Sequence, residues 1–384
     1  MNLKNFYSVN AIFGEGTIEH LQKIEKNHIA ILMGGKSQQS VVDAITDKFD
    51  KLGKEWRIVG NIKREPHMED IEKPLKEVID FKPDCILAIG GGSVMDSAKA
   101  IWIFYEYPNL KWDDVILPNP VPKLGNKAIL IAIPTTSGTG SETSSCAVVV
   151  DKKKMEKKLI ISQNILPTLA ILDTQLACTM PKHVAANSGM DAFTHALESA
   201  TSNMNNSIVQ RISLVTLLDI FKYLPTSING AKDSKEFKEA REKIHIASYL
   251  AGIAINNAGT GLAHIFDQVG PKLNIPHGLT CAILLPYTIE FTEEHPFYLE
   301  LAKVLGYKEE KGYARFLAQK IIELNKSVGI PPSFSEMGIG EKEYLEAMKE
   351  DIETSINSGG LQFAAKVPTY EDAEKFMLKA YYGK

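Results

Sequence analysis

The chain has 384 residues, of which 44% are hydrophobic and 23% are charged, and its formal net charge at pH 7 is −4. This length allows two ordinary domains with sizeable cores, and the composition is that of a globular protein. A net charge so small for this length gives no electrostatic reason to expect a nucleic acid or an anionic membrane as a partner.

Residues 1–180 alternate short β-rich runs with amphipathic segments. Strands are predicted at 28–33, 56–59, 85–89 and 128–133, and helices at 39–52, 68–81 and 94–105. Strands separated by helices of this length predict a parallel sheet that is covered on both faces. The lysine-rich run at 151–158 is flanked by β-like segments and is predicted to be a solvated loop or hairpin tip.

After Asp173 the spacing of apolar residues becomes helical. Helices are predicted at 184–200, 207–223, 236–256, 297–305, 311–328 and 341–357. The expected boundary lies at Met180-Pro181, because the residue before a proline disfavours a helix. We therefore predict an α/β domain at 1–180 and an all-α domain at 181–384.

A glycine-rich turn, Gly90 to Ser93, follows the predicted strand at 85–89. Glycines let the backbone turn sharply and approach a phosphate, and the helix that follows offers unpaired N–H groups. The turn lacks the G-x-G-x-x-G spacing of a standard Rossmann fingerprint, so a purely structural turn is an alternative.

A second polar segment, Pro134 to Glu142, follows the predicted strand at 128–133 and is rich in glycine and small hydroxyl residues. Ligands of open α/β sheets bind at the carboxyl ends of the strands. A plain polar surface loop is the alternative. Two segments of this kind at two strand ends favour a nucleotide-binding site.

Asp191 and His195 stand four residues apart in a segment with helical spacing, so they share one helix face. His264 lies in an apolar, glycine-rich segment, and His277 directly precedes an apolar run. One carboxylate and three imidazoles suit Fe(II) or Zn(II) with a further position left for a substrate oxygen. An Asp–His pair alone is more often an ordinary hydrogen bond, and the spacing does not decide between iron and zinc.

Together these motifs resemble those of the iron-containing (group III) alcohol dehydrogenase family. The matching segments are Gly90 to Ser93 with Asp96 and Lys99, Pro134 to Glu142, Leu172-Asp173 before Pro181, Gly189 to Glu198, Gly261 to His264 with Pro276 to Gly278, and Val328 to Pro332. They follow one another in order over most of the chain. Each is weak alone, but the combination is specific.

The resemblance implies a Rossmann-like dinucleotide-binding domain in a dehydroquinate-synthase-like arrangement, a helical metal- and substrate-binding domain, and an active site between them. The implied metal ligands are Asp191, His195, His264 and His277. The implied pyrophosphate loop is Gly91, Gly92 and Ser93, with Asp96 nearby, and the implied nicotinamide- and ribose-side contacts are Thr135, Thr136 and Lys157.

The activity implied is that of a metal-dependent alcohol dehydrogenase or aldehyde reductase. It would transfer hydride between NAD(P)H and a small aldehyde or primary alcohol. The family resemblance also suggests a homo-oligomer, a dimer or larger.

One position departs from the family pattern. Four residues after the third candidate ligand the family often has a histidine, and this chain has Gln268, which does not titrate near neutral pH. A histidine proton relay is therefore not expected there. Asp267 is a candidate substitute, with a solvated or salt-bridged aspartate as the alternative.

The turn after the strand at 28–33 bears on cofactor choice. NAD-preferring members usually have an aspartate there for the adenosine ribose 2′-hydroxyl, whereas this chain has Gly34, Gly35, Lys36 and Ser37. The missing carboxylate removes repulsion, and Lys36 and Ser37 could bind a 2′-phosphate. We predict a preference for NADP(H) over NAD(H), with Gly34, Gly35 and Ser37 among the cofactor contacts.

Other functions remain as alternatives. A metal-dependent sugar-phosphate cyclase or a polyol dehydrogenase could use the same fold, but a cyclase would need a basic phosphate pocket that does not cluster near the ligands. A non-catalytic nucleotide-binding protein is disfavoured because all four candidate ligands and both loops are present. Phe193, Phe266 and Tyr287 are candidate pocket residues, although aromatic residues in a helical domain are more often core.

The expected compartment is the cytoplasm. The N-terminal segment lacks the apolar stretch of a signal peptide, and the longest apolar runs are too short to span a bilayer. The cysteines at 85, 146, 178 and 281 are far apart and form no C-x-x-C pair. Structural disulfides and a thiolate zinc site are therefore not expected.

Overall fold

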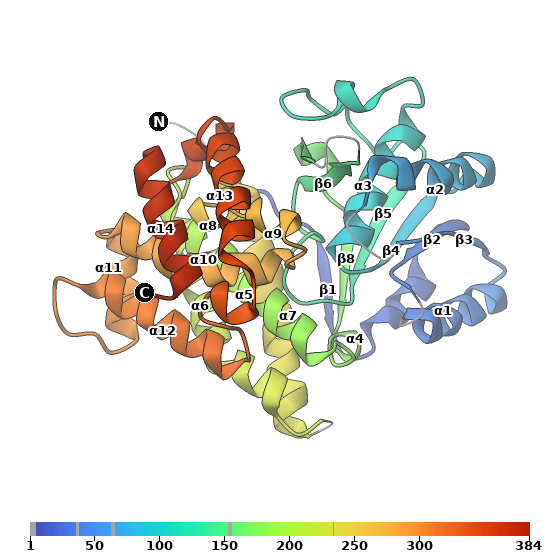
Figure 1. The fold of residues 1–384 in the computed structure, drawn as a ribbon. Coiled ribbons are helices and arrows are strands. Elements are labelled where there is room, and N and C mark those ends of the chain that lie inside the picture. The colour runs from blue at the N-terminus through green and yellow to red at the C-terminus, as the bar shows by residue number, and fades with distance from the viewer. Residues whose placement is uncertain (1–4, 36–37, 63–65, 153–155, 233) are drawn as a thin grey trace. The chain divides into compact units, whose positions relative to one another are not determined.

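The computed structural model describes residues 5–35, 38–62, 66–152, 156–232 and 234–384. The chain divides into two units, residues 1–180 and 181–384 (Figure 1). The dinucleotide-binding and metal-binding roles that we assign to these two parts stay predictions at this stage.

The first unit is built on a six-stranded parallel sheet with the order β1-β8-β5-β4-β2-β3. Its strands are β1 (Ala11–Gly14), β2 (His28–Met33), β3 (Glu55–Asn61), β4 (Cys85–Gly90), β5 (Ile129–Pro134) and β8 (Leu169–Asp173). The chain runs from β2 outwards to β3 and then returns to β4 on the other side of β2. The strand order therefore reverses between β2 and β4, and ligands of open α/β sheets bind at such a reversal.

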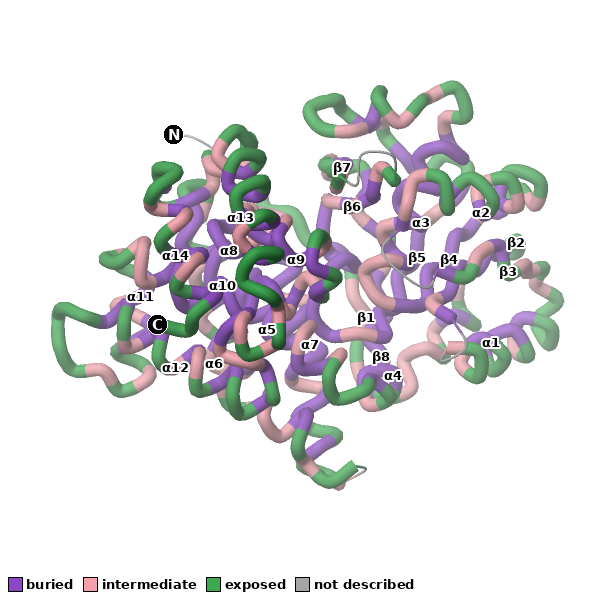
Figure 2. The backbone as a smooth tube through the Cα atoms, in the orientation of Figure 1, coloured by how far each residue is buried: buried purple, intermediate pink, exposed green. Residues whose placement is uncertain are grey.

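The sheet is buried on both faces, which confirms the predicted α/β architecture. Leu32, Ile86 and Leu130 belong to the apolar core on one face, whereas Ile31 and Leu87 belong to the core on the other. The two cores take alternate residues from each strand, because successive side chains point to opposite faces. This double burial explains why the central strands are nearly continuous apolar runs, and β4 is buried throughout (Figure 2).

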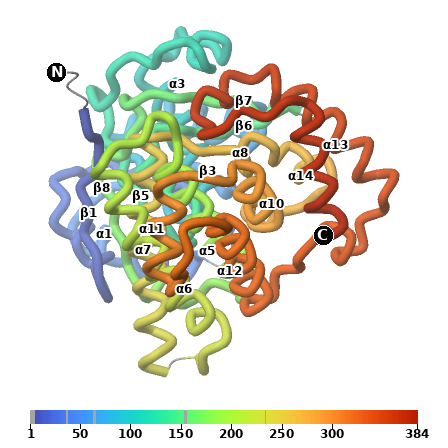
Figure 3. The backbone as a smooth tube through the Cα atoms, turned by 90° about the vertical axis from the view of Figure 1, so that its left-hand side faces the viewer, coloured from blue at the N-terminus to red at the C-terminus, as the bar shows by residue number. Residues whose placement is uncertain are grey.

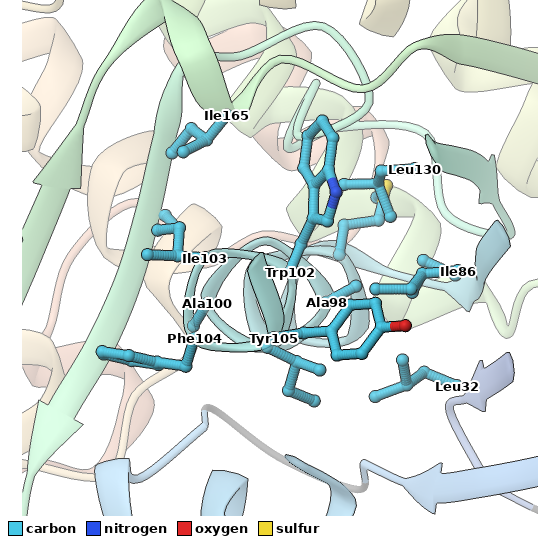
Figure 4. Packing of buried hydrophobic residues seen from close by; sticks show 14 of the residues in the cluster. Leu32, Ile86, Ala98, Ala100, Trp102, Ile103, Phe104, Tyr105, Leu130 and Ile165 are labelled. Atoms are coloured by element: carbon cyan, nitrogen blue, oxygen red, sulfur yellow. The ribbon is translucent and has the colours of Figure 1, made fainter. Parts of the chain in front are cut away.

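Helix α3 fills the middle of the first core. The helices of this unit are α1 (Gln39–Lys51), α2 (Met68–Phe81), α3 (Gly92–Glu106) and the short α4 (Thr174–Ala177). Trp102 and Tyr105 of α3 lie among the side chains that β2, β4 and β5 contribute (Figure 4). The Trp102 indole N–H donates to the carbonyl of Ala128 over 2.8 Å, so this large buried ring also satisfies its one polar atom.

An antiparallel hairpin of β6 (Cys146–Asp151) and β7 (Glu156–Ile161) completes the first unit. In the lysine-rich run at 151–158, Asp151 ends β6 and Lys157 and Lys158 lie in β7. Residues 153–155, for which a loop or hairpin tip was predicted, lie outside the described residues. Strands β1 and β8, with four and five residues, were not predicted because so short a stretch carries little periodicity.

The second unit is helical throughout the residues that the structure describes. Its helices are α5 (Lys182–Thr201), α6 (Ser207–Asn229), α7 (Lys235–Ala258), α8 (Leu262–Ile265), α9 (Val269–Lys272), α10 (His277–Thr292), α11 (Pro296–Val304), α12 (Tyr313–Ser327), α13 (Glu341–Ile356) and α14 (Tyr370–Tyr382). Helix α5 packs against α6, α7 and α10, and α13 lies beside α14 (Figure 3). None of the helices in the described part of the chain is both long and apolar enough to cross a membrane.

A buried lysine ties α3 to the chain that follows β5. Lys99 is fully buried, and its Nζ donates to Ser141 Oγ (3.0 Å) and to the carbonyls of Ser144 (2.8 Å) and Cys146 (2.7 Å). Asp96, one turn earlier, accepts from Ser141 Oγ over 2.6 Å and from the backbone N–H of Val148 over 3.0 Å. A buried charge needs such partners, so this network fixes the loop between β5 and β6.

We expect Lys99→Met to lower the free energy of unfolding by about 3 kcal/mol. The substitution leaves buried carbonyls without a donor, at about 1–3 kcal/mol each, and removes the cation beside Asp96. Urea denaturation followed by circular dichroism measures the change. Lys51→Met, at the exposed end of α1, is the control, and equal stability of the two variants would contradict this role.

Candidate functional site

One face of α5 carries two carboxylates and one imidazole. Asp191, His195 and Glu198 stand at positions i, i+4 and i+7, and a helix places residues with this spacing above one another. All three are buried, with exposed fractions of 2–5%. The apolar residues around them, such as Ala192 and Leu197, explain why the helix is buried from Gly189 to Thr201.

Two further histidines reach the same place from other elements. His264 lies in the single turn of α8, and His277 is the first residue of α10. Gly278 lets the start of α10 approach α5, because a Cβ atom at this position would lie 2.4 Å from the carbonyl oxygen of Asn187. A larger residue there would push His277 away from Asp191.

The structure brings the four predicted metal ligands together. Asp191 Oδ1 lies 3.8 Å from His195 Nε2, 3.5 Å from His264 Nε2 and 3.5 Å from His277 Nε2. One ligand atom from each residue lies within 4.8 Å of all the others. Atoms that each lie about 2.1 Å from one metal ion are at most about 4.2 Å apart, and the three distances from Asp191 Oδ1 fall within that limit.

Two atoms at the centre of this group support the fit to a cation. Asp191 Oδ1 and His264 Nε2 are buried and have no hydrogen-bond partner among the described residues. A buried polar atom without a partner is costly, and a metal ion bound to both atoms would remove that cost. The donor set, one carboxylate and three imidazoles, is one that Fe(II) and Zn(II) accept.

The ionisation of the site also favours a positive charge at its centre. Burial opposes ionisation of Asp191, yet the surrounding histidines hold the pKa of its carboxyl well below the usual range. Burial likewise opposes protonation of His264 and His277, yet neighbouring negative charges raise the pKa of both well above the usual value. Protons bound by these imidazoles would leave when a divalent ion enters, since metal ligands must be neutral imidazoles.

The second ring nitrogens of two histidines are bonded to buried carboxylates. His264 Nδ1 lies 2.6 Å from Glu198 Oε2, and His277 Nδ1 is hydrogen-bonded to Asp267. Such bonds fix the ring orientation and leave the opposite nitrogen for the metal. Cys281 Sγ lies 3.9 Å from His277 Nδ1, but that nitrogen already has its bond to Asp267.

These contacts bear on proton transfer near Gln268. The Asp267 carboxylate binds the ring of His277 and also accepts from Gln268 Nε2 over 3.2 Å. Asp267 is 2% exposed, so it is not a solvated aspartate. It is instead paired with His277, a candidate ligand, which is the salt-bridged alternative, and a role in proton transfer stays a prediction.

In the first unit, the carboxyl ends of β2, β4 and β5 carry the predicted cofactor loops. Gly91 is the N-cap of α3, and no described side chain caps the helix there, which leaves backbone N–H groups for an anion. A Cβ atom on Gly92 would lie 2.9 Å from Thr139 Cγ2, so this loop touches the loop after β5. Gln38 Nε2, after β2, donates to Thr135 Oγ1 over 3.3 Å.

The predicted cofactor residues have different surroundings. Gly34 and Gly35 follow β2, whereas Ser37 and Lys36 lie outside the described residues. Thr136 Oγ1 is buried without a hydrogen-bond partner in the described part of the chain. A bound ligand would supply the partner that a buried hydroxyl normally has. Lys157 pairs with Val150 in the hairpin.

Asp96, which was predicted beside the pyrophosphate loop, bonds the protein's own Ser141 and Val148, and a direct cofactor contact from it stays a prediction. The structure also reveals two supporting residues that were given no role from the sequence. Lys99 and Glu198 appeared only as parts of motifs. For Glu198 a signal was present, since it follows Asp191 by seven residues on a helix.

The three aromatic candidates for a substrate pocket belong to the core instead. Phe193 and Phe266 are fully buried, and Tyr287 is 4% exposed. Phe193 packs edge-on against Phe221, and Phe266 against Phe376. Their large apolar surface is used for packing the helices.

A carboxyl group from α13 supports the segment that joins His264 to His277. Asp351 is fully buried and accepts from the N–H of Val269 and from Ser355 Oγ, both over 2.7 Å. Ser355 Oγ also reaches the carbonyl of Ile265 over 2.7 Å. Burial, together with the nearby charge of Asp267, raises the pKa of Asp351 to about 7.

Comparisons with known proteins cover nearly the whole chain. Residues 8–174 match the family described as iron-containing alcohol dehydrogenase, and residues 185–375 match the C-terminal family of Fe-containing alcohol dehydrogenases. An NADPH-dependent butanol dehydrogenase of Clostridium saccharobutylicum is 33% identical over 378 residues, which are 97% of this chain and 96% of that protein. An alcohol dehydrogenase of Thermococcus barophilus is 34% identical over 98% of this chain and 99% of that protein.

A solved structure of the same family has the same fold. The structure of an iron-containing alcohol dehydrogenase from Thermococcus thioreducens superposes with a TM-score of 0.91 at 32% identity. The superposition covers 99% of this chain and 100% of that one. Both predicted parts of the fold, the parallel α/β sheet and the helical part, thus agree with this structure.

We expect Asp351→Asn to become more stable relative to the unmodified protein as the pH rises. Because folding raises the pKa of Asp351, its favourable contribution is complete only below the unfolded pKa and is lost as the pH rises to about 7. Asparagine does not ionise, so the variant should gain about 3 kcal/mol over the unmodified protein between pH 5 and pH 8.

Urea unfolding of the metal-free proteins at the two pH values measures this difference. Glu353→Gln, on an exposed position of the same helix, serves as the control and should show no such gain. A stability difference for Asp351→Asn that does not change with pH would contradict the raised pKa.

Proposed function

Because the chain belongs to the iron-containing alcohol dehydrogenase family and interconverts alcohols and aldehydes, we propose that it does so with a divalent ion on Asp191, His195, His264 and His277 and with NADP(H). The observation that carries the metal site is the convergence of four ligand atoms on one point. Asp191 Oδ1 and His264 Nε2 lie there buried and without hydrogen-bond partners in the described residues.

Fe(II) is the ion that we propose, with Zn(II) as the other candidate that the donors accept. When bound, such an ion would polarise the substrate oxygen as a Lewis acid, and the reduced nicotinamide would supply the hydride. Asp191 contributes negative charge, and the three imidazoles contribute neutral donors. The His277 side chain is 34% exposed, against 3–9% for the other three, so we place the approach of the substrate on its side.

The dinucleotide would bind along the carboxyl ends of β2, β4 and β5. The N–H groups of Gly91, Gly92 and Ser93 would hold the pyrophosphate at the start of α3. The hydroxyls of Thr135 and Thr136, with Lys157, would bind the nicotinamide and its ribose. Gly34, Gly35 and Ser37 would lie against the adenosine ribose, and Asp96 would support the loop beside the pyrophosphate.

The substrate is a small alcohol or aldehyde. The relative from Clostridium saccharobutylicum is named for butanol and NADPH, which supports a short-chain alcohol and NADP(H) here. We further propose a homo-oligomer in the cytoplasm, where the four free cysteines would stay reduced. The comparisons do not favour a sugar-phosphate cyclase or a polyol dehydrogenase.

Replacement of His264 by alanine should remove metal and turnover together. The change deletes one of four ligands and leaves Asp191 buried with less positive charge around it. Metal content by mass spectrometry and NADPH oxidation with butanal are the measurements, after reconstitution with Fe(II) or Zn(II). His183→Ala, exposed at the start of the same helix as Asp191, is the control, and full activity of a metal-free preparation would refute the scheme.

Cofactor preference has its own test. We expect kcat/KM to be higher with NADPH than with NADH, and Lys36→Asp to lower the NADPH value at least tenfold more than the NADH value, since a carboxylate there would repel the 2′-phosphate. Lys51→Asp, exposed at the end of α1, should leave kcat/KM unchanged with both NADPH and NADH. A clear preference of the unmodified enzyme for NADH would show that the NADP(H) proposal is wrong.

A further inference from the structure

We infer that Glu198 is a positioning residue of the metal centre, which holds His264 in the tautomer that presents Nε2 and fixes the turn before it. This inference rests on the proposed metal site. Glu198 does not lie among the ligand atoms themselves, so its effect would pass through His264.

The carboxylate of Glu198 receives three bonds from one short stretch of chain. Its Oε2 accepts from the N–H of Gly261 over 2.8 Å and contacts His264 Nδ1 over 2.6 Å. Its Oε1 accepts from the N–H of Ala263 over 2.6 Å. Glu198 is 5% exposed, so these partners replace the water that a carboxylate would otherwise bind.

This arrangement determines which nitrogen of His264 carries the hydrogen. Backbone N–H groups only donate, so Oε2 and Oε1 of Glu198 act as acceptors towards Gly261 and Ala263. The 2.6 Å contact to the ring then requires a hydrogen on Nδ1. In the neutral ring Nε2 must therefore carry the lone pair, and Nε2 is the atom that faces Asp191 Oδ1 at 3.5 Å.

Helix α5 and the residue that follows it, Ser202, also fix the backbone from which α8 starts. Ser199 Oγ donates to the carbonyl of Gly259 over 2.8 Å, and Ser202 Oγ donates to the carbonyl of Ala258 over 2.6 Å. Together with Glu198, these hydroxyls bind the chain from the end of α7 to the start of α8. One helix thus supplies two candidate ligands, Asp191 and His195, and orients a third.

Glu198→Gln tests this role with little change in volume. Glutamine has one acceptor oxygen and a donor NH₂ group, so it cannot accept all three bonds. We expect the dissociation constant for Zn(II), measured by competition with a chelator, to rise about 10–100-fold. The visible absorption bands of the Co(II)-substituted protein, which report ligand geometry, should shift as well.

A matched control exists in the first unit. Glu106 is buried and accepts from the N–H groups of Asn126 (3.2 Å), Lys127 (2.8 Å) and Ala128 (3.1 Å). Glu106→Gln disturbs the same kind of bonds far along the chain from any candidate ligand, so it should leave Zn(II) affinity and the Co(II) spectrum unchanged. Equal Zn(II) affinity of Glu198→Gln and the unmodified protein would overturn the inference, and so would an equal loss in both variants.

A measurement on the unmodified protein does not depend on whether the variant folds. In the Zn(II)-loaded protein labelled with ¹⁵N-histidine, the His264 ring should show a protonated Nδ1 and a metal-bound Nε2. A metal-bound Nδ1 would overturn the inference while leaving the metal site in place. A chain that binds neither Zn(II) nor Fe(II) would instead overturn the proposed metal site and the inference with it.

Discussion

Buried negative charge is the constraint on which the helical unit depends. Asp191, Glu198 and Asp267 are each 5% exposed or less, and an ionised carboxylate in such surroundings is stable only when donors or cations surround it. Two imidazoles supply these contacts, and each of them lies against two carboxylates. His264 lies between Asp191 and Glu198, and His277 lies between Asp191 and Asp267.

This alternation of carboxylates and imidazoles requires α5, α8 and α10 to keep fixed positions. Each ring has Nδ1 at the outer carboxylate and Nε2 towards Asp191 Oδ1, so a rotation of either ring would break both contacts. Asp351 and Ser355 of α13 also bind the segment between His264 and His277, through the N–H of Val269 and the carbonyl of Ile265. The geometry that suits a metal ion is thus built by hydrogen bonds between the protein's own groups.

The sheet unit meets its proposed ligand in a different way. At the carboxyl ends of its strands it presents backbone N–H groups and hydroxyls, such as Thr136 Oγ1, which are neutral. Its buried cation, Lys99, is bonded to the protein's own loop. An anionic dinucleotide would therefore meet oriented dipoles in a shaped loop, which stabilise charge without a buried counter-ion that must itself be desolvated.

Most elements with clear periodicity could be predicted from the sequence. Strands β2 to β5 and the helices α1 to α3, α5 to α7 and α11 to α13 were confirmed. Helix α10 was missed because its residues from Gly278 to Ile289 are nearly all buried and so show no polar face, and the amphipathic α14 was missed as well. The four candidate ligands were predicted, since their spacing and motifs are local. The bond from Asp351 to Val269 joins residues 82 apart, and no local pattern predicts such a contact.

The spacing of Asp191, His195 and Glu198 limits how this part of the chain can change in length. One residue inserted between Asp191 and His195 would turn everything after it by about 100° around the helix axis. The His195 imidazole and the Glu198 carboxylate would then point away from Asp191 and His264, although every side chain would still be present. For this stretch of α5, the count of residues is under as much constraint as their chemical identity.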